Sequence, residues 1–127
     1  MKYLLDSYAW IEYFKGTLKG QKVKEIIENK NNNLFTLDIC LAEIKFWALQ
    51  EKIDFSKICI VIRVNSEILE CTSDDWLNAA EIKFEQRKKI SDFGLVDAAM
   101  IAKQEEKGMV ILTGDKHFKE NKKALLI

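Results

Sequence analysis

Short apolar runs alternate with segments of helical periodicity along the chain, and this alternation restricts the fold more than any other feature. The clearest runs cover residues 3–5, 34–37 and 109–112. Continuous apolar runs of this length are typical of strands buried on both faces of a parallel sheet. Strands separated by helices form such a sheet with helices packed against it. The sequence therefore predicts an α/β fold, a three-layer α/β/α domain with a central, mainly parallel sheet.

Periodicity and capping residues predict the individual elements. We expect strands over residues 2–5, 34–37, 109–112 and 124–127. We expect helices over residues 7–14, 23–28, 38–52, 74–88 and 96–107, one helical turn within 115–121, and a loop over 15–20. Residues 55–64 fit a helix or a strand because they contain a β-branched run, and residues 67–72 are ambiguous. Helix caps are assigned to Asp38, Ser73, Asp74 and Asp92.

Composition limits the chain to one soluble domain. With 127 residues, 48% hydrophobic and 31% charged, we expect a single domain over residues 1–127 with a substantial core. The formal net charge of +0 excludes attraction of nucleic acid by the field of the whole molecule. Binding of a polyanion would therefore depend on local basic patches or on bound metal.

Cysteine usage and the N-terminus indicate the compartment. Three scattered cysteines and one histidine make a zinc site improbable and fit a reducing environment. The N-terminus lacks the pattern of a signal peptide, and no apolar run approaches the roughly 20 residues of a membrane span. We expect a cytoplasmic protein that does not associate with membranes.

Acidic residues stand where the predicted strands end or where helices begin. Asp6 follows the first apolar run, Asp115 follows the last one after a Thr113-Gly114 turn, Asp97 opens an apolar-rich helix, and Glu43 lies early in another. Ligands bind outside the carboxyl ends of the strands in an open α/β sheet. Converging carboxylates repel one another unless a cation neutralises them. The pattern predicts a hard, oxygen-liganded divalent metal.

Four motifs, taken in order, resemble those of the PIN-domain family and in particular its VapC-like toxin branch. They are Tyr3-Leu4-Leu5-Asp6-Ser7, Leu41-Ala42-Glu43, Val96 to Ala102, and Leu112 to Phe118. The resemblance spans nearly the whole chain. It implies a small α/β/α domain and an endoribonuclease that depends on Mg²⁺ or Mn²⁺ and leaves a 5′-phosphate and a 3′-hydroxyl.

The same resemblance implies roles for individual residues. The catalytic and metal-binding quartet would be Asp6, Glu43, Asp97 and Asp115. Ser7 and Thr113 would orient a carboxylate or a water, and Lys116 is a candidate substrate-binding residue. His117 stands where many relatives carry a further acid. The number of bound metal ions, one or two, is therefore left open. With two metals, roughly 3.5–4 Å apart, one would activate water and the other the leaving group. With one metal, Glu43 or Asp115 could serve as general base.

Basic and aromatic residues suggest surfaces for partners. Two clusters of basic residues could form a rim that binds RNA, although either cluster alone is more often a solvated helix face. The first cluster is Lys83, Arg87, Lys88 and Lys89, and the second is Lys116, Lys119, Lys122 and Lys123. Five aromatic residues on two early helices either pack in the core or form a hydrophobic groove for an antitoxin segment. They are Trp10, Tyr13, Phe14, Phe46 and Trp47. Glu12 is expected to face solvent.

The leading hypothesis is the toxin of a type II toxin–antitoxin pair, a homodimer inhibited by a cognate antitoxin protein. A PIN-domain RNA-processing nuclease without an antitoxin is an alternative, as is a non-catalytic RNA-binding module. A receiver-like phosphoryl-transfer domain is less consistent with the sequence. Such a domain would need paired acids after the first strand, whereas Asp6 is followed by Ser7 and Tyr8.

Overall fold

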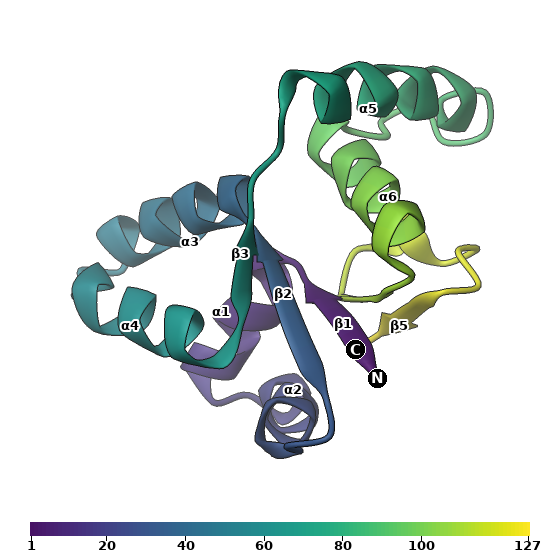
Figure 1. Cartoon of the computed structure of the whole chain (residues 1–127). Helices are drawn as coiled ribbons and strands as arrows, with labels where there is room; N and C mark the ends of the chain where they lie inside the picture. Colours follow the sequence, from purple (N-terminus) through teal and green to yellow (C-terminus); the bar gives the residue numbers. More distant parts are fainter.

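A five-stranded, fully parallel sheet forms the centre of the computed structural model, which describes residues 1–127 (Figure 1). The spatial order of the strands is β3-β2-β1-β4-β5. Their bounds are Lys2–Leu5 for β1, Asn33–Leu37 for β2, Glu67–Leu69 for β3, Val110–Thr113 for β4 and Ala124–Leu126 for β5. All four pairs of neighbouring strands run in the same direction. The predicted parallel sheet is confirmed, and the ambiguous segment 67–72 supplies its edge strand β3.

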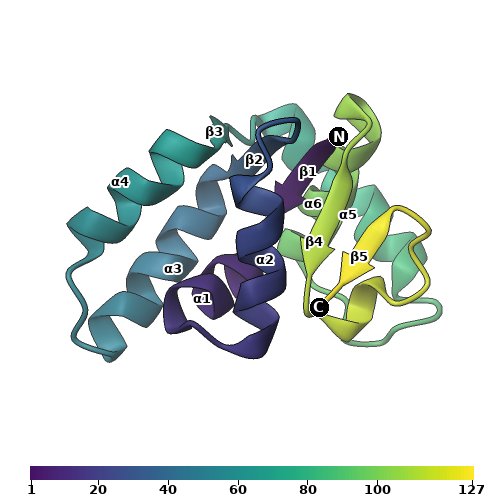
Figure 2. The ribbon, with the colours of Figure 1, turned by 90° about the horizontal axis from the view of Figure 1, so that it is seen from below.

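Helices cover both faces of this sheet and complete the predicted three layers (Figures 1 and 2). The helices on one face are α1 (Ser7–Lys15), α2 (Leu18–Glu28), α3 (Asp38–Gln50) and α4 (Phe55–Asn65). The other face carries α5 (Ser73–Gln86) and α6 (Leu95–Lys107), and a 3₁₀ turn, η1 (Lys116–Phe118), follows β4. Residues 55–64 are thus helical despite their β-branched run. None of the six α-helices has the length and apolar character that crossing a bilayer requires.

Successive side chains of the central strands pack into two separate hydrophobic cores, one on each face of the sheet. Leu4 packs into a cluster with α5 and α6, whereas its neighbour Leu5 packs into a cluster with α1, α3 and α4. Both leucines are fully buried. Burying one such side chain contributes roughly 2 kcal/mol. Because successive residues of a strand point to opposite faces, both positions must be apolar, which explains the continuous run in the sequence.

The predicted loop over residues 15–20 is mostly helix, because the two glycines that suggested it have different functions. Gly16 ends α1 in the left-handed conformation with φ of 69°. Thr17 caps α2 by accepting a hydrogen bond from the Gly20 N–H. A Cβ at Gly20 would overlap the Glu12 carbonyl of α1. Glycine therefore lets two helices approach closely here, and α2 begins at Leu18 instead of residue 23.

Three further predictions about local structure are wrong. Glu12 is 8% exposed, not solvent-facing, because the Thr17 hydroxyl donates to its carboxylate. The cap of α5 is Thr72, which forms a reciprocal capping box with Asp75, so neither Ser73 nor Asp74 is the cap. Asp38 is the first residue inside α3 and accepts hydrogen bonds from the backbone N–H groups of Ile39 and Cys71.

Candidate active site

The direction of the chain connections reverses between β1 and β4, and the candidate site lies at this point. From β1 the chain passes to β2 and β3 on one side, then returns to β4 on the other side of β1. Such a switch point leaves a crevice at the carboxyl ends of the two strands. Asp6 directly follows β1, and Asp115 follows β4 by two residues. The Asp6 backbone N–H donates to the Leu112 carbonyl at 3.2 Å, which joins the two strand ends.

All four predicted carboxylates line one cavity of about 230 Å³, which we call the acid cavity. Its lining residues are Asp6, Ser7, Tyr8, Cys40, Glu43, Val96, Asp97, Met100 and Asp115. The acids come from the end of β1, from α3, from the first turn of α6 and from the segment after β4. The fold therefore gathers side chains that are widely separated in the sequence, as the strand-end pattern predicted.

Hydroxyl groups and backbone amides hold the carboxylates on one side of the acid cavity. Asp6 caps α1 by accepting from the Ala9 N–H at 2.8 Å, and the buried Thr113 hydroxyl donates to its other oxygen. Ser7 Oγ donates to Glu43 Oε1 at 3.2 Å. We call this side the hydroxyl half; it consists of Asp6, Ser7, Glu43 and Thr113. Ser7 and Thr113 lie where they can orient carboxylates, as the resemblance implied.

The pKa values of the two acids in the hydroxyl half are raised. Burial raises the pKa of Asp6 to about 7, against the opposing hydrogen bonds from Thr113 and Ala9, and the charges of Asp115 and Asp97 add to the increase. Partial burial also raises the pKa of Glu43, although the bond from Ser7 lowers it. Glu43 is nevertheless the most exposed of the four acids.

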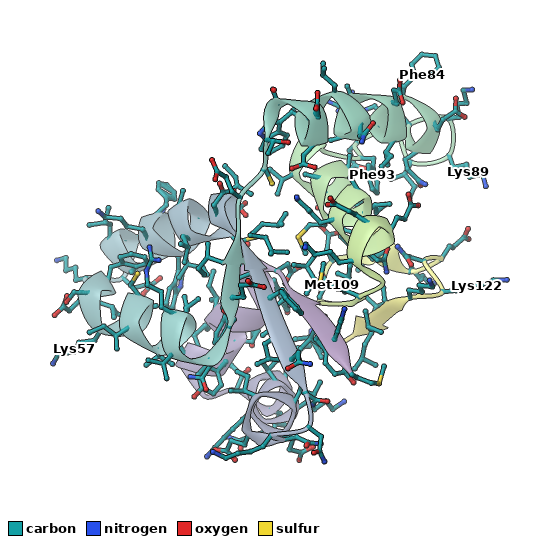
Figure 3. All side chains as sticks on the ribbon, viewed as in Figure 1. Lys57, Phe84, Lys89, Phe93, Met109 and Lys122 are labelled. Carbon is teal, nitrogen blue, oxygen red and sulfur yellow. The ribbon has the colours of Figure 1, made fainter.

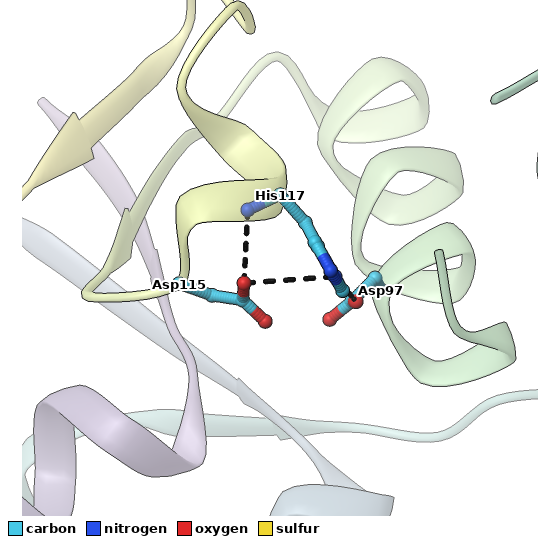
Figure 4. Close-up of side chains that lie close together, drawn as sticks. All are labelled: Asp97, Asp115 and His117. Atoms are coloured by element: carbon cyan, nitrogen blue, oxygen red, sulfur yellow. Dashed lines mark hydrogen bonds and ion pairs between the residues drawn. The ribbon is translucent and has the colours of Figure 1, made fainter. Parts of the chain in front are cut away.

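His117 holds two carboxylates on the other side of the acid cavity, Asp97 through its imidazole and Asp115 through its backbone N–H (Figure 4). His117 Nδ1 lies 2.8 Å from Asp97 Oδ2 and 3.6 Å from Asp115 Oδ1, and the His117 backbone N–H donates to Asp115 Oδ1 at 2.9 Å. Its Nε2 lies 3.1 Å from Asp92 Oδ1. We call this side the imidazole half; it consists of Asp92, Asp97, Asp115 and His117.

Opposite charges determine the titration of the imidazole half. Burial raises the pKa of Asp97, the hydrogen bond from His117 opposes that increase, and the charge of Asp115 adds to it. The hydrogen bond to Asp97 raises the pKa of His117, which burial partly offsets. At neutral pH the imidazole is thus biased toward its cationic form, which compensates for part of the negative charge of the cavity.

Asp92 was not predicted as part of the site. The sequence suggested a helix cap, but the cap of α6 is Gly94. Asp92 instead reaches His117 from the loop between α5 and α6, with its side chain 79% exposed. An acid two residues before a glycine carries no local signal for such a contact. The only indication in the sequence was His117 itself, because an imidazole at this place would require a carboxylate partner.

Basic residues from both predicted clusters line a second depression beside the acid cavity. Its volume is about 590 Å³, and its wall includes His117 together with Lys89, Lys116, Lys119 and Lys123. We call it the lysine cleft. None of these four lysines forms an ion pair, although Glu105 and Glu120 also lie in the wall. Lys116 therefore belongs to the cleft and is not among the residues that line the acid cavity.

The remaining predicted basic residues do not line the lysine cleft. Lys88 pairs with Glu85 at 3.0 Å, and Arg87 Nε donates to the Phe93 carbonyl at 2.9 Å. Lys83 and Lys122 are absent from the wall. Figure 3 shows Lys89 and Lys122 extending outward from different segments near α6 and β5. The basic rim is thus narrower than the sequence suggested, but it combines residues from two distant segments.

The early aromatic residues divide between core and surface. Trp10 is fully buried, and its indole N–H donates to the Thr36 hydroxyl at 3.0 Å. Tyr13, Phe14 and Trp47 are partly buried against the same core cluster. Phe46 is 60% exposed on α3. Core packing therefore explains most of this set, and only Phe46 is largely free for a partner.

The donor set of the acid cavity fits an oxygen-liganded divalent cation. Donor atoms of Asp97, Asp115 and His117 lie within 4.8 Å of one another, and Asp6 and Glu43 line the acid cavity together with the two aspartates. Burial and mutual repulsion raise the pKa values of Asp6, Glu43 and Asp97, so their simultaneous ionisation is costly without a cation. A dication would remove that cost, because carboxylate oxygens are the ligands that Mg²⁺ and Mn²⁺ prefer.

Comparison with known proteins supports the same fold. The PIN domain sequence profile matches residues 3–124. No curated protein matches the chain. VapBC2 from Rickettsia felis bound to a DNA fragment from its promoter is 16% identical over 100% of this chain and 98% of that chain, with a TM-score of 0.72.

Two further solved structures are similar to the same extent. A toxin–antitoxin complex from Klebsiella pneumoniae is 17% identical, with a TM-score of 0.73 over 97% of this chain and 95% of that chain. VapC20 from Mycobacterium tuberculosis, a sarcin–ricin loop cleaving toxin, is 17% identical, with a TM-score of 0.68 over 84% of both chains. The profile covers nearly the whole sequence and the fold agrees, so this protein belongs to the PIN domain family.

Proposed function

We propose that this protein is a divalent-metal-dependent endoribonuclease and the toxin of a toxin–antitoxin pair. The observation that carries the proposal is the acid cavity, where Asp6, Glu43, Asp97 and Asp115 meet at the switch point of the sheet. Membership of the PIN family and similarity to toxins of solved structure support it. Hydrolysis would leave a 5′-phosphate and a 3′-hydroxyl.

The four carboxylates would hold one or two Mg²⁺ or Mn²⁺ ions. Such an ion lowers the pKa of water and stabilises the charge that develops on the phosphate and leaving oxygen. Thr113 and the Ala9 amide fix the direction of the Asp6 oxygens toward the cavity. If only one ion binds, Glu43, the most exposed of the four acids, would be free of the metal and is the candidate general base. Ser7 would keep its carboxylate oriented.

The lysine cleft would bind the phosphate backbone of the RNA next to the scissile bond. Lys89, Lys116, Lys119 and Lys123 lack carboxylate partners, so their charges are available to phosphates. His117 belongs to both the cleft and the imidazole half, so a strand bound in the cleft would lie beside the carboxylates. In a protein with net charge +0, this local patch would supply the electrostatic part of the affinity.

The proposed partners are a cognate antitoxin protein and a second copy of this chain, in the cytoplasm. The structures from Rickettsia felis and Klebsiella pneumoniae are described as a VapBC pair and a toxin–antitoxin complex. Large apolar side chains on α3 and α4 are exposed here, among them Phe46, Leu49, Ile60 and Val64. Exposed apolar groups on neighbouring helices are typical of protein interfaces. Co-expression with the product of an adjacent short reading frame, followed by purification of the complex, separates a toxin from a processing nuclease.

Cleavage of end-labelled structured RNA tests the catalytic proposal. The wild-type protein should cut with Mg²⁺ or Mn²⁺ and stop after chelation. Asp97→Asn should lower the rate by roughly 10³-fold, because it removes a charge that orients the reacting groups. Asp74→Asn, which changes an exposed acid on α5, is the matched control and should leave the rate unchanged. RNA binding without cleavage by the wild type would instead indicate a non-catalytic RNA-binding module.

A further inference from the structure

The only imidazole of the chain stands between two carboxylates of the acid cavity (Figure 4). His117 Nδ1 is 2.8 Å from Asp97 Oδ2 and 3.6 Å from Asp115 Oδ1. Neighbouring ligand atoms around an octahedral ion with bonds of about 2.1 Å are about 3 Å apart. The contact with Asp97 has this spacing, and the ligand atoms of all three groups lie within 4.8 Å of one another, so one ion could draw them together.

A third carboxylate holds the far side of the same ring. Asp92 Oδ1 lies 3.1 Å from Nε2, the nitrogen that points away from the cavity. Histidines that bind metal almost always donate their other N–H to a carboxylate, a carbonyl or water, which fixes the tautomer and raises the basicity of the ligating nitrogen. With its Nε2 proton on Asp92, His117 directs Nδ1 toward Asp97 and Asp115, which line the acid cavity.

The surrounding residues restrict the orientation of the ring. Phe93 is fully buried and lies against the imidazole, with ring centroids 5.7 Å apart and an interplanar angle of 37°. The Arg87 guanidinium holds the Phe93 carbonyl at 2.9 Å and so anchors the loop that carries Asp92. The histidine is therefore positioned by packing and hydrogen bonding before any ion arrives, as a preorganised ligand requires.

We propose that His117 is a metal ligand, positioned by Asp92, and that it makes the site prefer a first-row transition dication to Mg²⁺. The inference rests on the metal dependence in the proposed function and specifies its cofactor. Imidazole nitrogen suits transition metals, whereas Mg²⁺ selects carboxylate, carbonyl and water oxygens. Among the probes used below, affinity should follow the order Co²⁺, then Mn²⁺, then Mg²⁺, because sites with nitrogen ligands favour the later metals.

Calorimetric titration of the full chain with Co²⁺, Mn²⁺ and Mg²⁺ tests the assignment without an activity assay. His117→Ala should weaken Co²⁺ binding by about 10-fold or more and Mg²⁺ binding by less than about threefold. His117→Asp should lower the ratio of Co²⁺ affinity to Mg²⁺ affinity, because it replaces a nitrogen ligand with an oxygen ligand. Asp92→Asn should weaken Co²⁺ binding by about 10-fold, since loss of an outer partner typically has this effect. Asp74→Asn is the matched surface control and should bind like the wild type.

A spectroscopic measurement on the wild type does not depend on how the variants fold. The chain has one histidine, so proton NMR of the Co²⁺-loaded protein should show one strongly shifted exchangeable imidazole signal, from the Nε2 proton beside Asp92. Addition of Mg²⁺ alone should not produce that signal. Its absence in a protein that has bound Co²⁺ would overturn the assignment.

The outcomes also separate this inference from the proposed function. If His117→Ala binds Co²⁺ and Mg²⁺ as tightly as the wild type or more tightly, the histidine is a counter-cation that metal displaces, and only the inference fails. If the wild type binds none of the three ions, the metal-dependent function fails together with the inference. A Co²⁺ affinity below the Mg²⁺ affinity would refute the preference itself.

Discussion

The hydroxyl half and the imidazole half of the acid cavity hold their carboxylates by different chemistry. Neutral donors orient Asp6 and Glu43, whereas the His117 imidazole pairs with Asp97 and lies 3.6 Å from Asp115, whose carboxylate accepts from the His117 backbone N–H. A hydroxyl donor fixes direction but leaves the negative charge almost unchanged, while an imidazolium fixes direction and compensates for charge. The most strongly raised carboxyl pKa in the cavity, about 7 for Asp6, belongs to the hydroxyl half. The need for an external cation is therefore greatest there.

Asp6→Asn gives the largest expected effect and tests whether charge in the hydroxyl half limits stability. The substitution keeps the cap of α1, since asparagine caps helices as well as aspartate does. It removes a buried charge, so the metal-free protein should gain roughly 1–3 kcal/mol of unfolding free energy at pH 8. RNA cleavage should fall by roughly 10³-fold. Thermal melts with chelator measure the gain in stability, and rate assays with metal measure the loss of cleavage. A variant less stable than the wild type would contradict the predicted gain.

The pH dependence of metal-free stability should distinguish the two halves. Asp6 titrates at about 7 in the folded protein and near its ordinary 3.8 when unfolded, so the folded state binds more protons between these values. Stability should therefore fall by roughly 1–3 kcal/mol as the pH rises from 4 to 7, and Asp97 and Glu43 should add to the loss. His117 contributes stability below 6.5 that is lost as the pH rises through its higher folded pKa.

Denaturant titrations of chelated protein between pH 4 and 9 measure this profile. Asp6→Asn should flatten the part below pH 7, and His117→Ala should flatten the part above about 6.5. A wild-type stability that rises from pH 4 to 7 would mean that the buried carboxylates gain more from their hydrogen bonds than they lose by burial.

Thr113→Val tests the buried anchor of the hydroxyl half at nearly constant side-chain volume. It removes the donor to Asp6 and the acceptor for the Asp115 N–H. Two partners lose a hydrogen bond in a buried place, so unfolding free energy should fall by about 1–3 kcal/mol. Urea titration measures the change. A variant as stable as the wild type would show that the Thr113 hydroxyl does not hold Asp6 in solution.

Ser7→Ala tests the exposed anchor of the same half and should have the smallest effect. Ser7 donates to the exposed Glu43, where water can replace the lost hydrogen bond. Unfolding free energy should change by less than about 0.5 kcal/mol. RNA cleavage should fall only a fewfold, mainly through poorer orientation of Glu43. A loss as large as that of Asp6→Asn would place Ser7 in direct contact with the reacting groups.

Local signals were sufficient to predict the sheet and the quartet. A strand buried on both faces needs an unbroken apolar run, and the residue after it stands at the edge where ligands bind, so Asp6 and Asp115 could be assigned from their neighbours alone. The orienting role of Thr113 followed from the resemblance to PIN domains. The position of Glu43 followed from its place in a motif, although its exposure did not.

Features that depend on contacts between distant segments were not predictable in this way. Gly20 suggested a loop because its sequence neighbours do not reveal that the α1 backbone lies against it. Glu12 suggested a solvent-facing acid because its partner, Thr17, is the cap of the next helix, α2. Asp92 and His117 meet only when the loop before α6 folds against η1. Each error arose where packing, and not periodicity, determined the environment of a side chain.

The pairing of β1 with β4 also sets the time at which the cavity can exist. Thr113 and Asp6 are separated by 107 residues along the chain. A ribosome adds about 5–20 residues each second, so β1 is made roughly 5 to 20 seconds before its neighbour β4. A growing polypeptide therefore holds only Asp6, and then Glu43, without Asp97 and Asp115. Whatever chemistry the acid cavity performs begins only after the segment that follows β4 has been synthesised.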